Sequence, residues 1–174
     1  MDVGSAVCEQ AQRERIFQGA EDCMKELKAV ILDYLSQTKL LQIGTTKNNK
    51  PWVATVWFAH DKDFNFYFIS HRERRHSDEL SENPNVAGTI VAPHTLGSGE
   101  KVVGLQFEGV AEEIEDEKEL ENALDVYYSR YPNADRIPHE QFHNGVACYV
   151  IHPKTLVLFD QVDYFDNPRH ELKL

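Results

Sequence analysis

The sequence predicts a closed or nearly closed antiparallel β-barrel with peripheral helices, a mainly-β fold. One amphipathic helix is followed by five to seven β-rich segments, most of them joined by short turns. Barrel closure removes the exposed edges that such strands would otherwise present. Tight turns do not fit a doubly wound parallel sheet, which needs long crossovers. The chain also lacks G-x-G-x-x-G at a helix start and G-x-x-x-x-G-K-[ST], which excludes both phosphate-binding loops in their usual forms.

The composition is that of an ordinary globular protein of one domain. The chain has 174 residues, 41% of them hydrophobic and 27% charged, and its net charge is −11. This acidity argues against broad binding to nucleic acid or to anionic membranes, which need a basic face. No apolar run approaches the roughly 20 residues of a membrane span. Residues 1–7 lack the basic and long apolar parts of a signal peptide, so we expect a cytoplasmic protein.

The domain is expected over residues 21–174, after a polar and loosely held arm at 1–20. Its first element is a helix up to about residue 36, because apolar residues recur there at three and four positions. Further helices are expected at 74–82 and 116–130, and a flexible loop at 92–100. The expected strands are 40–46, 51–59, 64–70, 86–91, 102–115, 147–151 and 155–159, with turns at 47–50 and 60–63.

The cysteines indicate no disulfide framework. Cys8, Cys23 and Cys148 are odd in number and widely spaced. This pattern suits reduced thiols in a cytosol, each of them buried or incidental.

A cluster of cations at residues 71–76, His-Arg-Glu-Arg-Arg-His, stands out in this acidic chain. It lies between an apolar strand and a helix start, where arginine donors and free backbone N–H groups would meet an anion such as phosphate. Ser70 and Ser77 flank the cluster and could donate hydroxyl hydrogen bonds. The alternative is a solvated turn whose charges offset neighbouring carboxylates.

Aromatic residues gather on adjacent predicted strands, and two interpretations remain open for them. The set comprises Trp52, Trp57, Phe58, Phe66, Tyr67 and Phe68. They could form core and dimer packing, or a flat apolar wall for a planar ring. A phosphate site beside such a wall would fit a phosphorylated aromatic cofactor.

Residues 139–143, His-Glu-Gln-Phe-His, match the zinc-protease pattern H-E-x-x-H. Pro138 and Gly145 confine this segment to at most two helical turns, and no glutamate ligand stands at the usual distance downstream. We therefore expect a short surface helix and no metal. No carboxylate pair or Ser/His/Asp set stands out either, so the catalytic residues stay unassigned.

Several segments, in this order and spacing, resemble the pyridoxamine 5′-phosphate oxidase-like, FMN-binding split-barrel superfamily, and small, poorly characterised bacterial members in particular. The resemblance covers about residues 22–165 and is carried by 51–58, 66–70, 75–76, 83–90, 101–111 and 128–132. It implies a six-stranded Greek-key barrel that forms a homodimer, with two FMN molecules at the subunit interface.

The resemblance also implies which residues bind the cofactor. Thr55, Val56 and Trp57 would run along the isoalloxazine ring. Ser70, Arg75 and His76 would meet the phosphate, with Arg74 in support and Lys101 nearby, while Gln106 would reach the cofactor from the partner subunit. Arg72 is expected to face solvent.

Two departures from the superfamily limit the expected activity. Residues 53–58 lack the basic residues that hold the phosphate in true pyridoxamine phosphate oxidases, and residues 166–174 lack their arginine-rich substrate motif. We therefore expect no activity on pyridoxamine phosphate. The prediction is an oxidoreductase that passes electrons from NAD(P)H through FMN to a small acceptor.

Three alternatives to this prediction remain. One is a haem-binding or haem-degrading protein, for which His71, His76, His94 and His170 are the candidate axial ligands. The others are a non-enzymatic protein that binds flavin nucleotide, and a reductase that uses deazaflavin.

Overall fold

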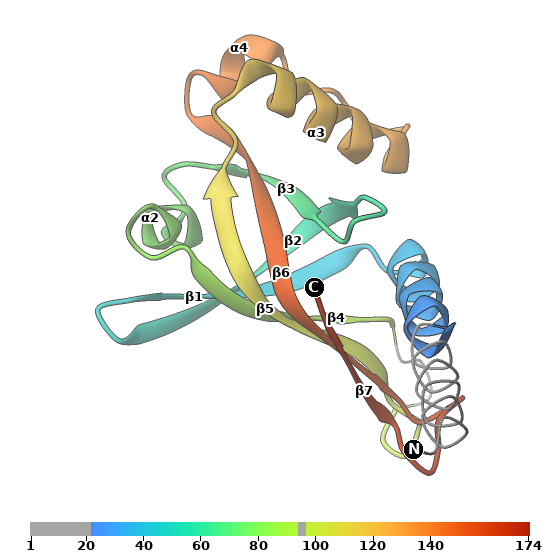
Figure 1. Ribbon diagram of the computed structural model, residues 1–174. Helices are drawn as coiled ribbons and strands as arrows, with labels where there is room; N and C mark the ends of the chain where they lie inside the picture. Colours follow the sequence, from blue (N-terminus) through green and yellow to red (C-terminus); the bar gives the residue numbers. More distant parts are fainter. Residues whose placement is uncertain (1–21, 94–96) are drawn as a thin grey trace, which may run out of the picture.

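A seven-stranded antiparallel sheet curls into a barrel (Figure 1). The computed structural model describes residues 22–93 and 97–174, so the predicted arm at 1–20 lies outside the described residues. The strand order is β3-β2-β1-β4-β5-β6-β7, and an additional pairing of β3 with β6 closes the barrel. The predicted mainly-β antiparallel fold is confirmed.

The elements follow the sequence pattern closely. The first described helix spans 22–37. The remaining elements are β1 (Leu40–Lys47), β2 (Lys50–His60), β3 (Phe66–His71), α2 (Arg75–Glu82), β4 (Asn85–Val91), β5 (Val103–Glu113), α3 (Glu117–Arg130), α4 (His139–Phe142), β6 (Val146–Asp160) and β7 (Arg169–Lys173).

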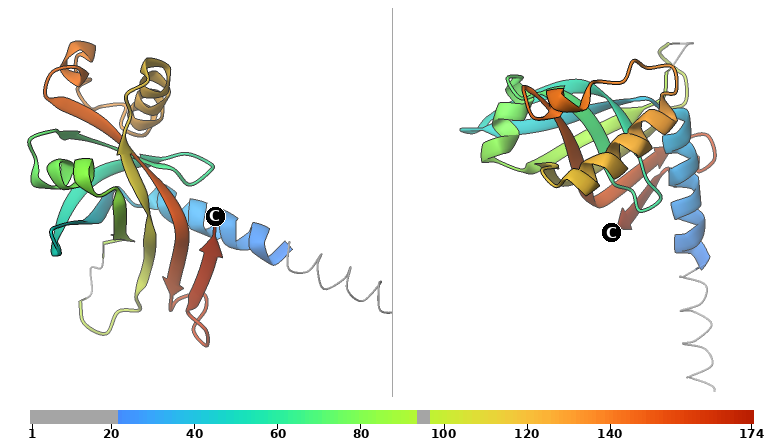
Figure 2. Two further views of the ribbon diagram at one scale, coloured as in Figure 1. Left: turned by 60° about the vertical axis from the view of Figure 1, so that its left-hand side comes forward. Right: turned by 90° about the horizontal axis from the view of Figure 1, so that it is seen from above.

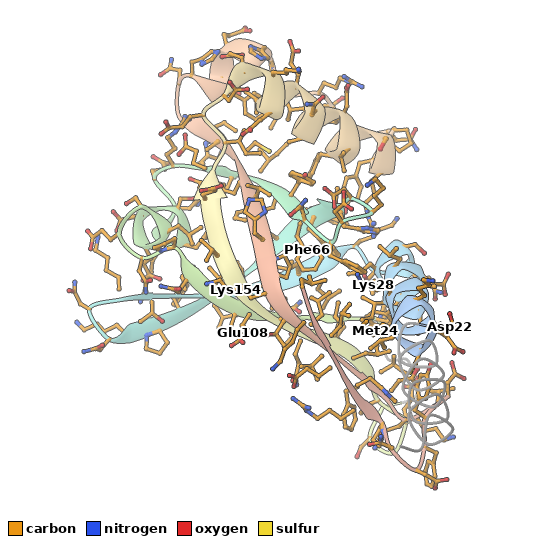
Figure 3. All side chains as sticks on the ribbon, in the orientation of Figure 1. Asp22, Met24, Lys28, Phe66, Glu108 and Lys154 are labelled. Atoms are coloured by element: carbon orange, nitrogen blue, oxygen red, sulfur yellow. The ribbon has the colours of Figure 1, made fainter. Side chains whose placement is uncertain are left out.

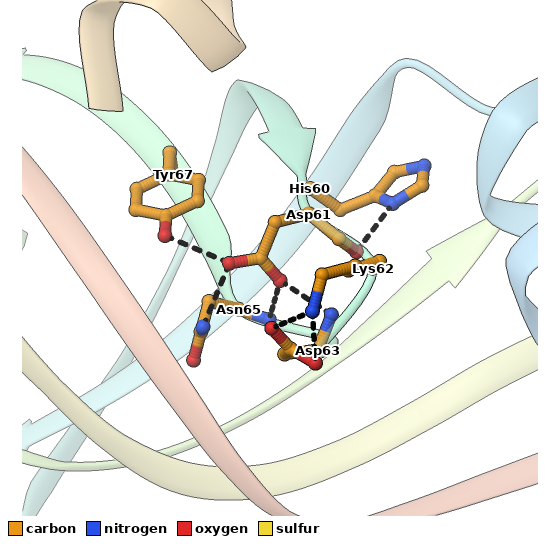
Figure 4. Close-up of polar contacts among 6 residues, drawn as sticks. All are labelled: His60, Asp61, Lys62, Asp63, Asn65 and Tyr67. Carbon is orange, nitrogen blue, oxygen red and sulfur yellow. Dashed lines mark hydrogen bonds and ion pairs between the residues drawn. The ribbon is translucent and has the colours of Figure 1, made fainter. Parts of the chain in front are cut away.

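Two tight turns set the register of the first three strands. Asn48 and Asn49 have φ of 52° and 59° between β1 and β2, the left-handed backbone that two-residue hairpins require and asparagine tolerates. Between β2 and β3, the Asp61 carboxylate accepts hydrogen bonds from the backbone N–H of Asp63 and of Asn65, both at 2.9 Å. It also accepts one from the Tyr67 hydroxyl at 2.9 Å (Figure 4). Both predicted turns are therefore held by local chemistry.

Strand β6 is continuous, where the sequence pattern predicted two strands interrupted at His152-Pro153. The register between β5 and β6 shifts between Glu108 and Gly109, and Gly109 lies opposite Pro153. A proline can sit at such a bulge because the ladder needs no N–H donor there. A Cβ at Gly109 would come within 2.3 Å of the His152 carbonyl oxygen, so only glycine fits this close approach.

Strand β7 was not predicted. It pairs with the second half of β6, from Thr155 to Phe159, whereas β3 pairs with the first half, from Val146 to Ile151. Strand β6 thus changes partner halfway along its length, from β3 to β7, while β5 pairs with it on the other side.

The barrel interior is aromatic and apolar. Phe58, Phe66 and Phe68 have no exposed surface, so half of the aromatic set is core packing. The helix at 22–37 packs against the barrel through Ile31 and Leu35, which are fully buried and belong to the same core cluster as these phenylalanines. The helix extends away from the barrel (Figure 2). A second apolar cluster lies under α3 and α4. Among the described residues, no helix is long and apolar enough to cross a membrane.

Candidate functional site

Strand β2 has an open edge. On one side β1 pairs with residues Lys50 to Trp57 of β2. On the other side β3 pairs only with Phe58–His60, so residues 51–57 have no strand partner there among the described residues. Alternate N–H and C=O groups of an edge strand point outward. This segment therefore offers backbone hydrogen bonds to a ligand.

The residues predicted along the ring lie on this segment with different orientations. Thr55 is exposed and Trp57 keeps 54% of its surface exposed, with its ring edge-on to Tyr131 at 5.8 Å. Val56 points into the core and is 8% exposed. Val56 can therefore contact a ligand at the surface only through its backbone.

The start of α2 has no side-chain cap. Its N-cap residue is Arg74, whose side chain makes no capping hydrogen bond. The first-turn N–H groups of Arg75, His76 and Ser77 thus lack the side-chain acceptor that usually satisfies a helix N-terminus. The partial positive charge of the helix end adds to the charges of the Arg74 and Arg75 guanidinium groups.

Arg75 connects this helix end to the open edge of β2. Its guanidinium carbon lies 4.3 Å from the ring centroid of Trp52, which is on β2. Its Nε donates to Glu79 Oε1 at 2.7 Å, and Thr45 donates to the other oxygen of Glu79 at 2.6 Å. These two donors lower the pKa of Glu79. Because only Nε is engaged among the described residues, the terminal nitrogens of Arg75 stay available.

His76 and Ser70 form a pair beneath the cluster. Ser70 Oγ and His76 Nε2 are 2.8 Å apart, and His76 is 8% exposed. Burial lowers the pKa of His76, and the charge of Arg74 lowers it further, against a smaller opposing effect of Glu79. The lowered pKa favours the neutral imidazole. The positive charge of Arg74 would stabilise an anion here, and the Ser70–His76 pair could contribute a hydrogen bond.

Arg72 does not belong to this site, and the expectation that it faces solvent is wrong. Its Nε and Nη2 donate to Glu113 Oε1 at 2.9 and 2.5 Å. Its guanidinium also donates to the carbonyls of Val146 and Phe142, at 2.5 and 2.8 Å. Arg72 therefore ties the β3–α2 turn to the ends of β5 and α4.

Gln106 lies on the outer face of the sheet, in a groove of about 880 Å³. Neighbouring strands place Gln106, Thr89, Gln42 and Thr55 side by side in one row. Three strand spacings separate Gln106 from Thr55, roughly 14 Å. Within one protomer, Gln106 therefore lies apart from the open edge of β2. Glu108, next on the same face, is labelled in Figure 3.

Lys101 also lies apart from the cluster. Its Nζ is 5.3 Å from the ring centroid of Phe165, at the start of β5, whereas α2 adjoins the other end of β5 through the hydrogen bond from Ala111 N to Pro84 O. One protomer thus brings Ser70, Arg74, Arg75 and His76 together at the start of α2, and Arg75 contacts Trp52 on β2. Thr55 and Trp57 lie further along β2, and Lys101 and Gln106 lie apart from both.

The groove has residues that the sequence interpretation missed. Arg169, Glu171 and Lys173 of β7 line it, and they alternate with His170 and the buried Leu172. This period of two was the available signal, but a segment of five residues, four of them polar, resembles a surface loop as much as a strand.

The candidate haem ligands have separate surroundings. His71 is exposed at the end of β3, His76 is hydrogen-bonded to Ser70, and the ring of His170 lies 4.3 Å from that of Tyr164. His94 falls outside the described residues.

Comparison with known proteins gives one family. The model described as pyridoxamine 5′-phosphate oxidase matches residues 27–157. A UPF0306 protein of Photorhabdus laumondii is 29% identical over 104 residues, which cover 59% of this chain and 71% of that protein.

Solved structures share the fold at low identity. A Bacteroides thetaiotaomicron protein, provisionally assigned to 5-nitroimidazole antibiotic resistance, superposes with a TM-score of 0.63 at 22% identity, covering 74% of this chain and 80% of that one. A heme binding protein from Mycobacterium smegmatis gives 0.62 at 16% identity, over 79% and 54% of the two chains. Likeness at this level concerns the fold alone.

Proposed function

Because this chain belongs to the pyridoxamine 5′-phosphate oxidase family, we propose that it is an FMN-binding oxidoreductase that passes electrons from NADH or NADPH to a small acceptor. One observation carries the proposal: the uncapped, arginine-flanked start of α2 adjoins the open edge of β2. A phosphorylated planar cofactor has an anionic phosphate at one end and a ring with hydrogen-bonding edges at the other. The start of α2 suits the phosphate, and the open edge of β2 suits the ring.

The start of α2 fits the phosphate of FMN. Free N–H groups at a helix N-terminus bind phosphate oxygens, and arginine forms paired, charge-assisted hydrogen bonds with them. Arg74 has no side-chain hydrogen bond to a described residue, and Arg75 uses only Nε. Ser70 and His76 would add two further polar groups at the base of this site.

The open edge of β2 fits the ring. Backbone groups of residues 55–57 would pair with the polar edge of the isoalloxazine, and the exposed side chain of Trp57 would shield part of it from water. FMN, when bound, supplies the hydride and electron chemistry. The role of this chain is then to orient the ring and to keep one of its faces accessible to a donor.

We further propose that a second copy of the chain completes the site. Gln106 lies roughly 14 Å from Thr55 in the same protomer, so it can reach the cofactor only from a partner. The outer sheet face that carries Gln106 is grooved and holds both polar and apolar side chains. This face would seat the second protomer in a homodimer.

The test compares FMN with riboflavin, which lacks the phosphate. In calorimetric titrations, Arg74→Ala combined with Arg75→Ala should weaken FMN binding at least about tenfold, since each charge-assisted hydrogen bond contributes roughly 1.5–3 kcal/mol. Riboflavin binding should stay unchanged. Equal affinities of the double variant and the unaltered chain for FMN would exclude the phosphate assignment.

Spectra and reduction kinetics then separate the remaining candidates. Purified protein should show flavin absorbance at about 370 and 450 nm, whereas a band at about 400 nm would indicate haem. A larger rise in melting temperature with deazaflavin than with FMN would favour a deazaflavin enzyme. If neither NADH nor NADPH reduces the bound flavin in stopped-flow measurements, the result would favour a non-enzymatic protein that binds flavin nucleotide.

A further inference from the structure

Two histidines and one glutamate converge at the far end of the molecule from the groove. His139 Nε2 lies 3.3 Å from one carboxylate oxygen of Glu117, and His143 Nε2 lies 3.2 Å from the other. The two imidazole rings are 5.3 Å apart. One potential ligand atom from each residue lies within 4.8 Å of the other two. This is the spacing of a metal-binding set.

The local fold holds these three side chains in place. His139 begins α4 and His143 is its C-cap residue with a helical backbone, so four positions of spacing put both imidazoles on one face. Phe142, between them, is 3% exposed and anchors α4 in the core. The hydrogen bond from Ile137 N to Tyr128 OH, at 2.8 Å, fixes the chain that leads into α4.

Glu117 comes from the start of α3, which lies beside α4 (Figures 1 and 2). A helix N-terminus by itself disfavours a cation. Here Asp116 already caps it, because its carboxylate accepts from the N–H groups of Lys118 and Glu119, both at 3.0 Å. Glu117 is therefore free to turn its carboxylate toward the histidines.

We propose that Glu117, His139 and His143 form a binding site for a divalent transition metal of the zinc class. Imidazole and carboxylate together suit zinc, nickel and copper better than magnesium or calcium, which prefer oxygen ligands alone. All three side chains are about half exposed, so water can fill the remaining coordination positions. The metal would clamp α4 to α3 across the connecting segment 131–138.

This site differs from that of a zinc protease and lies apart from the proposed flavin site. The third ligand precedes the two histidines in the chain, and it comes from a separate helix. Simple ion pairing explains the arrangement less well, because two imidazoles share one carboxylate. An ordinary pair is present at His152 and Glu112, where one imidazole lies 3.4 Å from one carboxylate oxygen. That pair supplies a matched control.

The test is a zinc titration of tag-free protein against a chromophoric chelator. We expect one equivalent of Zn²⁺ to bind, with at least about a tenfold loss of affinity in His143→Ala and in Glu117→Gln, since removing one of three ligands costs no less than removing an outer-shell partner. His152→Ala should bind zinc as the unaltered chain does. Zinc should also raise the melting temperature of the unaltered protein but not of His143→Ala.

Two results would overturn the proposal. One is the same zinc affinity in the unaltered chain and in a combined His139→Ala, His143→Ala variant. The other is a loss of affinity in His152→Ala as large as that in His143→Ala, which would mean nonspecific binding to surface histidines. Circular dichroism and metal-free melting confirm that each variant is folded, since all the substituted side chains are exposed.

Discussion

Arg72 should be a stability residue, in contrast to the adjacent arginines of the same cluster. Its guanidinium bridges Glu113 and the carbonyls of Phe142 and Val146, which joins segments 41 to 74 residues apart in the chain. Replacement by methionine keeps the apolar stem and removes every one of these hydrogen bonds. The substitution therefore isolates the polar contribution.

The expected cost follows from the exposure of these groups. Hydrogen bonds from a charged donor contribute about 1.5–3 kcal/mol each when shielded. The side chain of Arg72 is 37% exposed, so the two bonds to carbonyls are taken at about 1 kcal/mol each. The ion pair with Glu113, itself 29% exposed, adds at most about 1 kcal/mol. The total of about 3 kcal/mol corresponds to a fall in melting temperature of roughly 6–12 °C for a chain of this size.

The assay is thermal unfolding by calorimetry, together with FMN titration. Arg72→Met should melt lower by the stated amount and bind FMN normally at a temperature where it is folded. Arg74→Met is the control, because its exposed side chain makes no hydrogen bond to a described residue; its melting temperature should change by less than about 2 °C. A melting temperature of Arg72→Met within about 2 °C of the unaltered chain would refute the structural role of Arg72.

Two further predictions concern titration and thiol reactivity. Burial lowers the pKa of His76 from 6.5, so the unfolded chain binds this proton more readily, and the free energy of unfolding falls as pH drops below about 6.5. His76→Gln should flatten the dependence of melting temperature on pH between about 7 and 5, and parallel curves would contradict this. Burial raises the pKa of the Cys148 thiol to about 12, so iodoacetamide should modify exposed Cys23 in native protein and Cys148 only after denaturation, as peptide mass spectrometry would show; equal modification rates would contradict the burial of Cys148.

Local sequence patterns predicted the elements whose physics is local. Helix periodicity predicted a helix from about residue 21 to 36, which the structure has at 22–37. The asparagine pair predicted the β1–β2 turn, because φ preferences and amphipathic spacing act over a few residues. Pro153 was misleading, since its effect depends on Gly109 across the sheet. Strand β7 was missed because its hydrogen bonds go to β6 and its side chains are mostly polar.

The site shows the same division between local and long-range information. The cluster at 71–76 was recognisable as cationic, but no pattern within it tells which arginine meets a carboxylate 41 residues away. Glu117 escaped notice for the same reason. The sequence interpretation sought a third ligand downstream of His143, whereas the fold brings one from the preceding helix.

The shape of the barrel explains why the residues predicted to bind the cofactor occur in two groups. Strand β2 extends past the point where β3 pairs with it, which leaves the edge of 51–57 beside the start of α2. The row from Thr55 to Gln106 runs across the outer face, perpendicular to that edge. A twisted barrel cannot bend this row back onto its own open edge. In the proposed dimer, the outer face of one protomer closes the edge of the other, and neither protomer alone would enclose the ring.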